Sequence, residues 1–153
     1  MANYMKPVVF KLGNELYGVD INLVQGIENH VSMVPVPNAV TYVKGIINLR
    51  GVVVPVYSLK RKFNMPDDVQ AKSWIIITAG NAMIALEVDE VVEIGNMEPK
   101  NITPMPILVK KQDTLYLDRV ANTSDGLVVL LDVGHLLTEE EEENVIKLAE
   151  DMQ

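Results

Sequence analysis

The most restrictive feature of this sequence is a pattern of strands and turns that occurs twice. In the first half, Gly13-Asn14 separates two short apolar runs and Asp20 follows the second run. In the second half, Gly80-Asn81 lies 67 residues after the first pair, and Asp89 lies 69 residues after Asp20. Gly-Asn between apolar runs is typical of a tight hairpin turn. These spacings favour an internal duplication of about 70 residues over the alternative that two strand-rich halves merely look alike.

A further hairpin is predicted within residues 43–56, where apolar, largely β-branched runs flank Arg50-Gly51. Arg50 carries the only charge between Lys44 and Lys60, and Asn48 adds an amide two residues earlier. A guanidinium in such surroundings offers five N–H donors to a carboxylate or carbonyl partner. None of these groups is a nucleophile or a metal ligand. The segment therefore favours recognition over catalysis.

Three short helices are predicted from residues that cap helix N-termini. Asp20 precedes a turn or two in which Ile21, Val24 and Ile27 share one side, Ser58 precedes a brief helix to Phe63, and Asp132 precedes a third. Residues 138–153 predict a C-terminal helix, because Thr138 and Glu141 form a capping box. Apolar positions then recur on one face at Val145, Leu148 and Met152.

The remaining pattern predicts a mostly β protein. Each half holds about five short strands and has too few residues for a sandwich, and small closed barrels leave no exposed strand edges. A barrel of roughly 60 to 70 residues is marginally stable alone. We therefore expect two five-stranded barrels that pack over a shared apolar interface with a groove between them, and residues 64–68 are the best linker candidate.

Composition excludes several classes of protein. The net charge is −8, with five of the acidic residues at 139–143, and the chain lacks the basic stripe that binds nucleic acid. It contains no cysteine, no apolar run long enough to cross a bilayer, and no apolar segment of a secretory signal near its start. We expect a cytoplasmic protein without direct membrane insertion.

Catalytic and cofactor patterns are missing as well. His30 and His135 lie far apart, and no metal-binding histidine pattern, nucleophile elbow, phosphate loop or dinucleotide fingerprint occurs. Adjacent acids such as Asp89-Glu90 point to opposite faces of a strand and are more often turn formers than an acid–base pair. We therefore expect no catalytic residues, no metal and no cofactor.

Several segments form one extended pattern. They are F-x-L-G-x-E-x-Y-G-V-D-I at residues 10–21, then Val24 and Ile27, V-P at 34–35, V-K-G-I-I-N-L-R-G-V-V-V-P-V at 43–56 and L-L-D at 130–132. Together these segments resemble the CheW family of chemotaxis adaptors. The resemblance implies a single CheW-like domain over residues 1–153, built of two intertwined five-stranded SH3-like barrels with short helices and the C-terminal helix. The subdomains are expected at approximately 15–80, and at approximately 81–137 together with the N-terminal strand.

The resemblance also implies a non-catalytic bridge between the cytoplasmic hairpin tip of chemoreceptors (methyl-accepting chemotaxis proteins) and the regulatory domain of the histidine kinase CheA. The protein would then be recruited to membrane-associated receptor arrays. The receptor would bind a groove of the first barrel by a helix-in-groove mode. Kinase-contact residues are not assigned. The implied receptor-binding residues are Val24, Ile27, Gly45, Asn48, Arg50 and Gly51.

Two positions depart from the family pattern. Gly26 stands where the family usually has a glutamate that can pair with the motif arginine, so Arg50 must pair elsewhere, with Glu28 as a candidate, or face solvent. Arg119 stands where the family tends to have glycine. Three alternatives remain open. The protein could be a scaffold of a specialised signalling system or a small-molecule sensor that uses the groove between the barrels. The third alternative, a binder of single-stranded nucleic acid, is disfavoured by the negative net charge.

Overall fold

The computed structural model of the chain describes residues 4–29, 32–37, 42–67, 72–79, 82–106 and 116–136. The strands are β1 (Pro7–Leu12), β2 (Glu15–Asp20), β3 (Val24–Glu28), β4 (Met33–Pro35), β5 (Val43–Leu49), β6 (Val52–Ser58), β7 (Ser73–Ala79), β8 (Ala82–Val88), β9 (Glu90–Ile94), β10 (Ile102–Pro104), β11 (Leu117–Thr123) and β12 (Gly126–Leu131). Helical turns are η1 (Ile21–Leu23), α1 (Leu59–Lys62), η2 (Pro99–Asn101) and η4 (Val133–His135). The mostly β fold class is confirmed. The predicted helix at 138–153, the turn at 80–81 and His30 lie outside the described residues.

The strands form two sheets of identical topology. The first sheet has the order β3-β7-β8-β6-β5-β4 and the second has the order β9-β1-β2-β12-β11-β10. Moving six strands along the chain converts one order into the other. Each sheet also has one parallel pair at the same place, β6 with β8 and β12 with β2. The internal duplication is therefore confirmed, with β1–β6 as one repeat and β7–β12 as the other.

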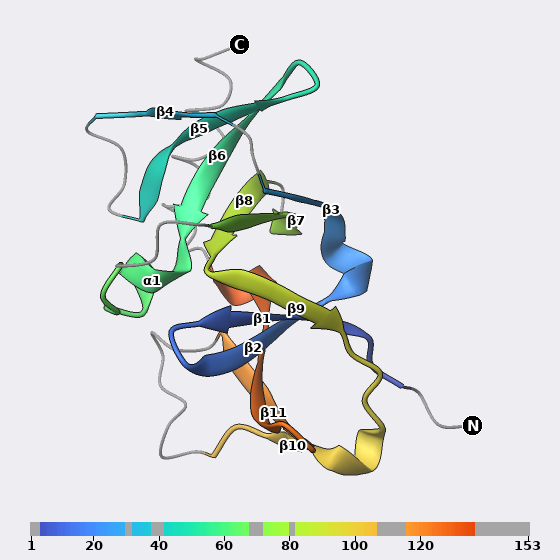
Figure 1. Cartoon of the computed structure of the whole chain (residues 1–153). Coiled ribbons are helices and arrows are strands. Elements are labelled where there is room, and N and C mark those ends of the chain that lie inside the picture. The colour runs from blue at the N-terminus through green and yellow to red at the C-terminus, as the bar shows by residue number, and fades with distance from the viewer. Residues whose placement is uncertain are drawn as a thin grey trace.

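Each repeat gives its first hairpin to the sheet that the other repeat mainly builds. β1 and β2 join β9–β12, and β7 and β8 join β3–β6, so that the two halves are intertwined (Figure 1). The expected subdomain limits, at residue 15 and between 80 and 81, would separate the two strands of each hairpin. The sheets instead divide the chain so that residues 24–88 supply the first sheet and the flanking segments supply the second.

The sheets have six strands each among the described residues, one more than the five expected. The difference in the first repeat arises at residues 24–28, which the sequence suggested as part of a helix but which form β3. Only residues 21–23 are helical there, although Asp20 caps them as predicted by accepting a hydrogen bond from the Asn22 backbone N–H at 2.9 Å. Pairing with β7 gives β3 the backbone partners that an isolated short helix would lack.

Apolar side chains are buried on both faces of the strands. A large core joins the two sheets and includes Val8, Phe10 and Leu12 from β1, Tyr57 from β6, Ile75 and Ile77 from β7, and Ile84, Leu86 and Val88 from β8. The other face of each sheet surrounds a core of its own: Ile47, Val54, Val56, Trp74, Ile76 and Ala85 in the first, and Val9, Met97, Ala121, Val128 and Leu130 in the second. Burial on two faces explains why these strands are apolar without alternation.

A cluster of ion pairs crosses the junction between the sheets. Lys44 contacts Glu87 at 2.7 Å and Asp67 at 3.1 Å, and the Glu87 carboxylate also accepts a hydrogen bond from Trp74 Nε1 at 3.0 Å. These residues belong to the first sheet and to the segment that follows α1. The whole cluster consists of Lys44, Lys60, Lys72, Asp67, Glu87 and Asp89.

Asp89 connects this cluster to the second sheet. Its carboxylate contacts Lys60 at 2.7 Å and Lys72 at 3.1 Å, and it accepts a hydrogen bond from the backbone N–H of Gly13, in the β1–β2 turn, at 2.8 Å. Burial raises the pKa of Asp89 and of Asp67, but hydrogen bonds from the lysines and from Gly13 outweigh it. The pKa of each carboxyl group therefore lies below its ordinary value of 3.8.

Because the large core is shared, truncating it on one sheet should destabilise the other. We predict that Phe10→Ala lowers the free energy of unfolding by about 4 kcal/mol. Fluorescence of Trp74, which lies in the first sheet's own core, and far-UV circular dichroism should report the same single transition in urea. Leu127→Ala, at an exposed position of β12, should change stability by less than about 0.5 kcal/mol. Two separate transitions would contradict a shared core.

The ion cluster predicts a loss of stability in acid. A carboxyl group whose pKa is lowered by folding stabilises the protein above its unfolded pKa, and this contribution disappears as the pH falls through the lower, folded pKa. Asp89→Asn should therefore cost on the order of 3 kcal/mol at neutral pH, and the difference from the parent protein should shrink below about pH 4. Urea unfolding across this range measures the difference. A cost that is independent of pH would exclude the ionic contribution.

Candidate binding site

The β5–β6 hairpin ends in a two-residue turn, Arg50-Gly51, at the far end of the first sheet (Figure 1). Leu49 pairs with Val52, so the predicted hairpin is confirmed. Both turn residues have positive φ, +53° for Arg50 and +87° for Gly51, as a type I′ hairpin turn requires. Asn48 Oδ1 accepts a hydrogen bond from the Gly51 backbone N–H at 2.8 Å, which closes the turn.

Arg50 is exposed at this turn. Among the residues that the structure describes, its guanidinium makes no ion pair and no hydrogen bond. Glu28, the partner considered from the sequence, instead lies opposite Trp74 in the pairing of β3 with β7. A left-handed φ costs a residue with a Cβ about 1 kcal/mol or more. The turn thus holds a strained arginine with its donors directed to solvent.

Gly45, another of the implied site residues, is buried within the sheet. A Cβ at this position would lie 2.3 Å from the Val34 carbonyl oxygen, far inside contact distance. The close approach that this glycine permits is therefore that of β4, which pairs with β5 through Pro35 and Gly45. In the described structure its role is to hold β4 against the hairpin.

Val24 and Ile27 lie on β3, at the edge of the first sheet. Val24 is half-buried and packs against the core shared by the sheets, whereas Ile27 is 38% exposed. Leu23 and Met83 are also exposed apolar residues, on η1 and on β8. β3 thus offers an apolar contact through Ile27, and the packing of Val24 against the shared core anchors the strand.

The internal repeat relates β3 to β9 and the β5–β6 hairpin to the β11–β12 hairpin. Gly26 pairs with Ile76 next to a bulge, and Glu93 pairs with Val9 next to an equivalent bulge. Gly26 and Glu93 are therefore equivalent positions. With a glutamate in place of Gly26, residues 24–27 would follow the pattern V-x-E-I, and residues 91–94 of the second repeat have this pattern.

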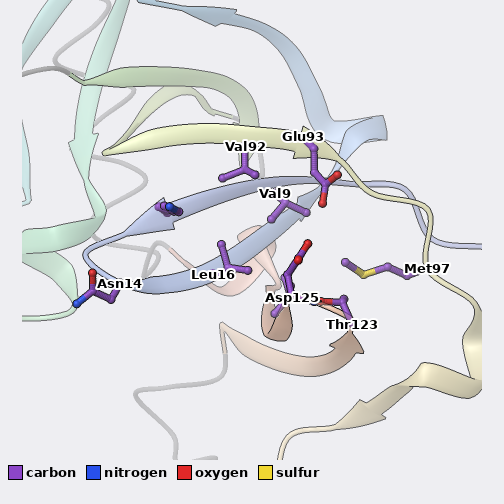
Figure 2. Close-up of a pocket in the computed structure, with 10 residues that line it drawn as sticks. Val9, Asn14, Leu16, Val92, Glu93, Met97, Thr123 and Asp125 are labelled. Atoms are coloured by element: carbon purple, nitrogen blue, oxygen red, sulfur yellow. Dashed lines mark hydrogen bonds between the residues drawn. The ribbon is translucent and has the colours of Figure 1, made fainter.

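In the second sheet, Glu93 and the β11–β12 turn border one cavity. Figure 2 shows Glu93 and Asp125 pointing toward the same space from opposite sides, and Val9 and Leu16 line that space between them. By the repeat, Gly26 and the Arg50-Gly51 turn occupy the corresponding places on the first sheet. The first repeat therefore keeps the arginine without the glutamate, and the second keeps the glutamate without the arginine.

Within the described ranges, no three His, Cys, Asp or Glu side chains gather closely enough to bind a metal ion. In the same ranges, no helix has both the length and the apolar character needed to cross a membrane.

Comparison with known proteins identifies the family. The model of the CheW-like domain family matches residues 6–141. The chemotaxis protein CheW of Klebsiella aerogenes is 31% identical over 136 residues, which cover 88% of this chain and 82% of that protein. The chemotaxis protein CheW of Bacillus subtilis is 27% identical over 143 residues, which cover 92% of each.

This chain belongs to the CheW family. The crystal structure of the scaffolding protein TtCheW from Thermoanaerobacter tengcongensis superimposes with a TM-score of 0.82 at 31% identity, covering 92% of this chain and 97% of that one. The resemblance found in the sequence is thus confirmed, and the protein is a chemotaxis scaffold or adaptor. The structural likeness is consistent with the expected SH3-like barrels.

The second departure from the CheW pattern, Arg119, is equivalent to Gly45 in the repeat. Arg119 pairs with Pro104 of β10 as Gly45 pairs with Pro35 of β4. Its side chain is half-exposed, and its Nε donates to Asp118 Oδ2 at 2.9 Å. The second sheet therefore accommodates a long side chain where the first sheet requires glycine.

The cavity of the second sheet and the position of Glu93 at its border were not predicted from the sequence. A signal was present: aligning the two repeats over their hairpins places residues 91–94 on residues 24–27 and reveals the glutamate. The ion cluster had no such signal, because its members come from separate elements far apart in the chain.

The two glycines of the first sheet should respond oppositely to an added methyl group. Gly45→Ala should destabilise the protein by about 2 kcal/mol or more, because the Val34 carbonyl must move. Gly26→Ala should be neutral or stabilising by up to about 1 kcal/mol, because no atom lies within 4 Å of its Cβ position. Thermal unfolding of both variants tests this, and equal losses of stability would refute it.

Proposed function

We propose that this CheW-family protein is a non-catalytic adaptor that couples chemoreceptors to the histidine kinase CheA. The observation that supports it most is the tip of the first sheet, where a strained hairpin turn holds Arg50 exposed and without a partner among the described residues. A conformation that costs free energy and leaves a guanidinium unpaired is typical of a recognition site.

The receptor-binding surface that we propose combines this turn with β3. Ile27 receives apolar side chains of a helical receptor hairpin, and Arg50 binds a backbone carbonyl or a carboxylate on the receptor. Asn48 and Gly51 fix the turn, Gly45 holds β4 against the hairpin, and Val24 anchors β3 on the shared core. Binding of this kind needs no chemical step, in keeping with a scaffold.

The proposal also includes the location of the protein. An adaptor between receptor tips and a kinase works in the cytoplasm and is recruited to membrane-associated receptor arrays through its partners. With glycine at position 26, Arg50 has no partner among the residues that the structure describes, which would suit a receptor that supplies the carboxylate itself. A receptor of a specialised signalling system would satisfy this requirement as well.

Titration of a receptor-tip hairpin fragment against the protein tests the proposed surface. Arg50→Ala and Ile27→Asp should each weaken receptor binding about tenfold or more, because they remove a charged contact and place a carboxylate in an apolar one. Val24→Asp should abolish binding but also destabilise the core, so its stability must be measured in parallel. Binding of the CheA regulatory domain should be measured with the same variants.

The repeat supplies matched controls. Ile94→Asp changes the position equivalent to Ile27 on β9, and Arg61→Ala removes another exposed arginine. Both variants should bind the receptor fragment as the parent protein does. Failure of the parent protein to bind either partner at tens of micromolar would reject the adaptor function. The proposed surface would be rejected if Ile94→Asp weakened receptor binding as much as Ile27→Asp, or if Arg61→Ala weakened it as much as Arg50→Ala.

A further inference from the structure

The second sheet contains a cavity of about 370 Å³. Its floor is apolar and belongs to the sheet's own core: Val9 and Val128 are almost fully buried, and Met97 is 7% exposed. Figure 2 shows Leu16 beside Val9, and Val92 beside β1 at the upper side. The cavity lies within the second sheet, between β1, β2, β9 and the β11–β12 hairpin, rather than in the predicted groove between the two barrels.

Charged side chains surround this apolar floor, and none of them is paired within the described part of the chain. Glu93 and Asp125 approach from opposite sides (Figure 2), and Lys11 also lines the cavity. No ion pair or side-chain hydrogen bond satisfies these three groups among the described residues. At the junction between the sheets, by contrast, all six charges of the ion cluster are paired.

The strand register separates the charges of opposite sign. Glu93 lies opposite Val9, whereas Lys11 lies opposite Glu90, two residues farther along β1. Two residues of a strand span about 7 Å, so Lys11 does not lie directly across from Glu93. The register thus places Lys11 two residues along β1 from the level of Glu93, while Asp125 reaches the same cavity from the β11–β12 turn (Figure 2).

We propose that this cavity binds a small organic cation, an ammonium or guanidinium group carried on an apolar body. The cation would lie between Glu93 and Asp125, and the body would cover Val9, Leu16 and Val128. The volume is at the lower end of that of small-molecule sites. A stable protein–protein interface needs more than about 1,000 Å² of buried surface, which a cavity of this size does not supply by itself.

This site is separate from the proposed receptor-binding surface, which lies on the first sheet. It assigns the second repeat a function of its own: where the first repeat presents a cation, the second presents two carboxylates. Ligand binding here is independent of whether the adaptor proposal holds.

Three probes with the same six-carbon chain test the site: hexylamine, hexanol and hexanoate. Titration of the full-length protein, followed by two-dimensional NMR, should show hexylamine binding with a Kd of about 1 mM. The shifts should be centred on β9 and the β11–β12 hairpin. Hexanol should bind at least about tenfold more weakly, and hexanoate should not bind detectably.

Variants that change one charge each give effects of predictable sign. Glu93→Gln and Asp125→Asn should each weaken hexylamine binding about threefold, because each removes an attractive charge. Lys11→Gln should strengthen binding about twofold, because it removes a repulsive charge. Arg50→Ala, which alters the receptor-binding surface, should leave hexylamine binding unchanged. All four positions are exposed, so an unchanged thermal midpoint confirms that the variants fold.

Several outcomes would overturn the proposal. Equal binding of the amine and the alcohol would reduce the cavity to an apolar pocket without charge selectivity. Shifts that map elsewhere, or no binding of hexylamine at 10 mM (about ten times the expected Kd), would remove the site. A basic peptide that binds at Glu93 and Asp125 while the free amine does not would replace the small ligand with a protein partner.

Discussion

Burial of apolar side chains between the two sheets stabilises the whole protein. The first hairpin of each repeat belongs to the other repeat's sheet, so both repeats contribute to the shared core. Phe10 on β1 and Ile77 on β7 occupy equivalent positions, and both enter the one core that the sheets share. Neither repeat can form a complete sheet without the other. The ion cluster that links Lys44 to Asp89 crosses the same junction, and the hydrogen bond from Gly13 extends it into the second sheet.

This exchange leaves the two ends of the molecule free to differ. Each sheet has a two-residue hairpin tip and an outer strand, β3 or β9, and the internal repeat makes the two arrangements equivalent. One end carries Arg50 without a partner among the described residues, and the other carries Glu93 and Asp125 above a cavity. A duplicated fold has thus produced two surfaces of opposite charge on one scaffold. We propose a protein-binding function for one and a small-ligand function for the other.

Much of this arrangement could be predicted from the sequence. The turns at Gly13-Asn14 and Arg50-Gly51, and the caps at Asp20, Ser58 and Asp132, follow from local chemistry and are all found. The strand at residues 24–28 was missed, because Val24 and Ile27 also fit a helical spacing and only pairing with β7 decides the conformation. The limits of the subdomains were not predicted correctly, because the sequence of a hairpin does not show which of the two sheets it joins.

In the candidate site, too, local features were predicted from the sequence and contacts between distant segments were not. The motif at residues 43–56 located the exposed tip, since a hairpin turn and a lone arginine are local features. The burial of Gly45 against Val34, the supporting place of Val24 and the ion cluster depend on contacts between distant segments.

The sequence by itself determined the hairpins, the duplication and the family, because turn residues and repeated spacings act over a few positions of the chain. Only the tertiary structure decided which hairpin enters which sheet, which glycines are required and which charges are paired. These depend on the side-by-side placement of strands that lie many residues apart. No local pattern fixes that placement, and burial of the shared core selects it.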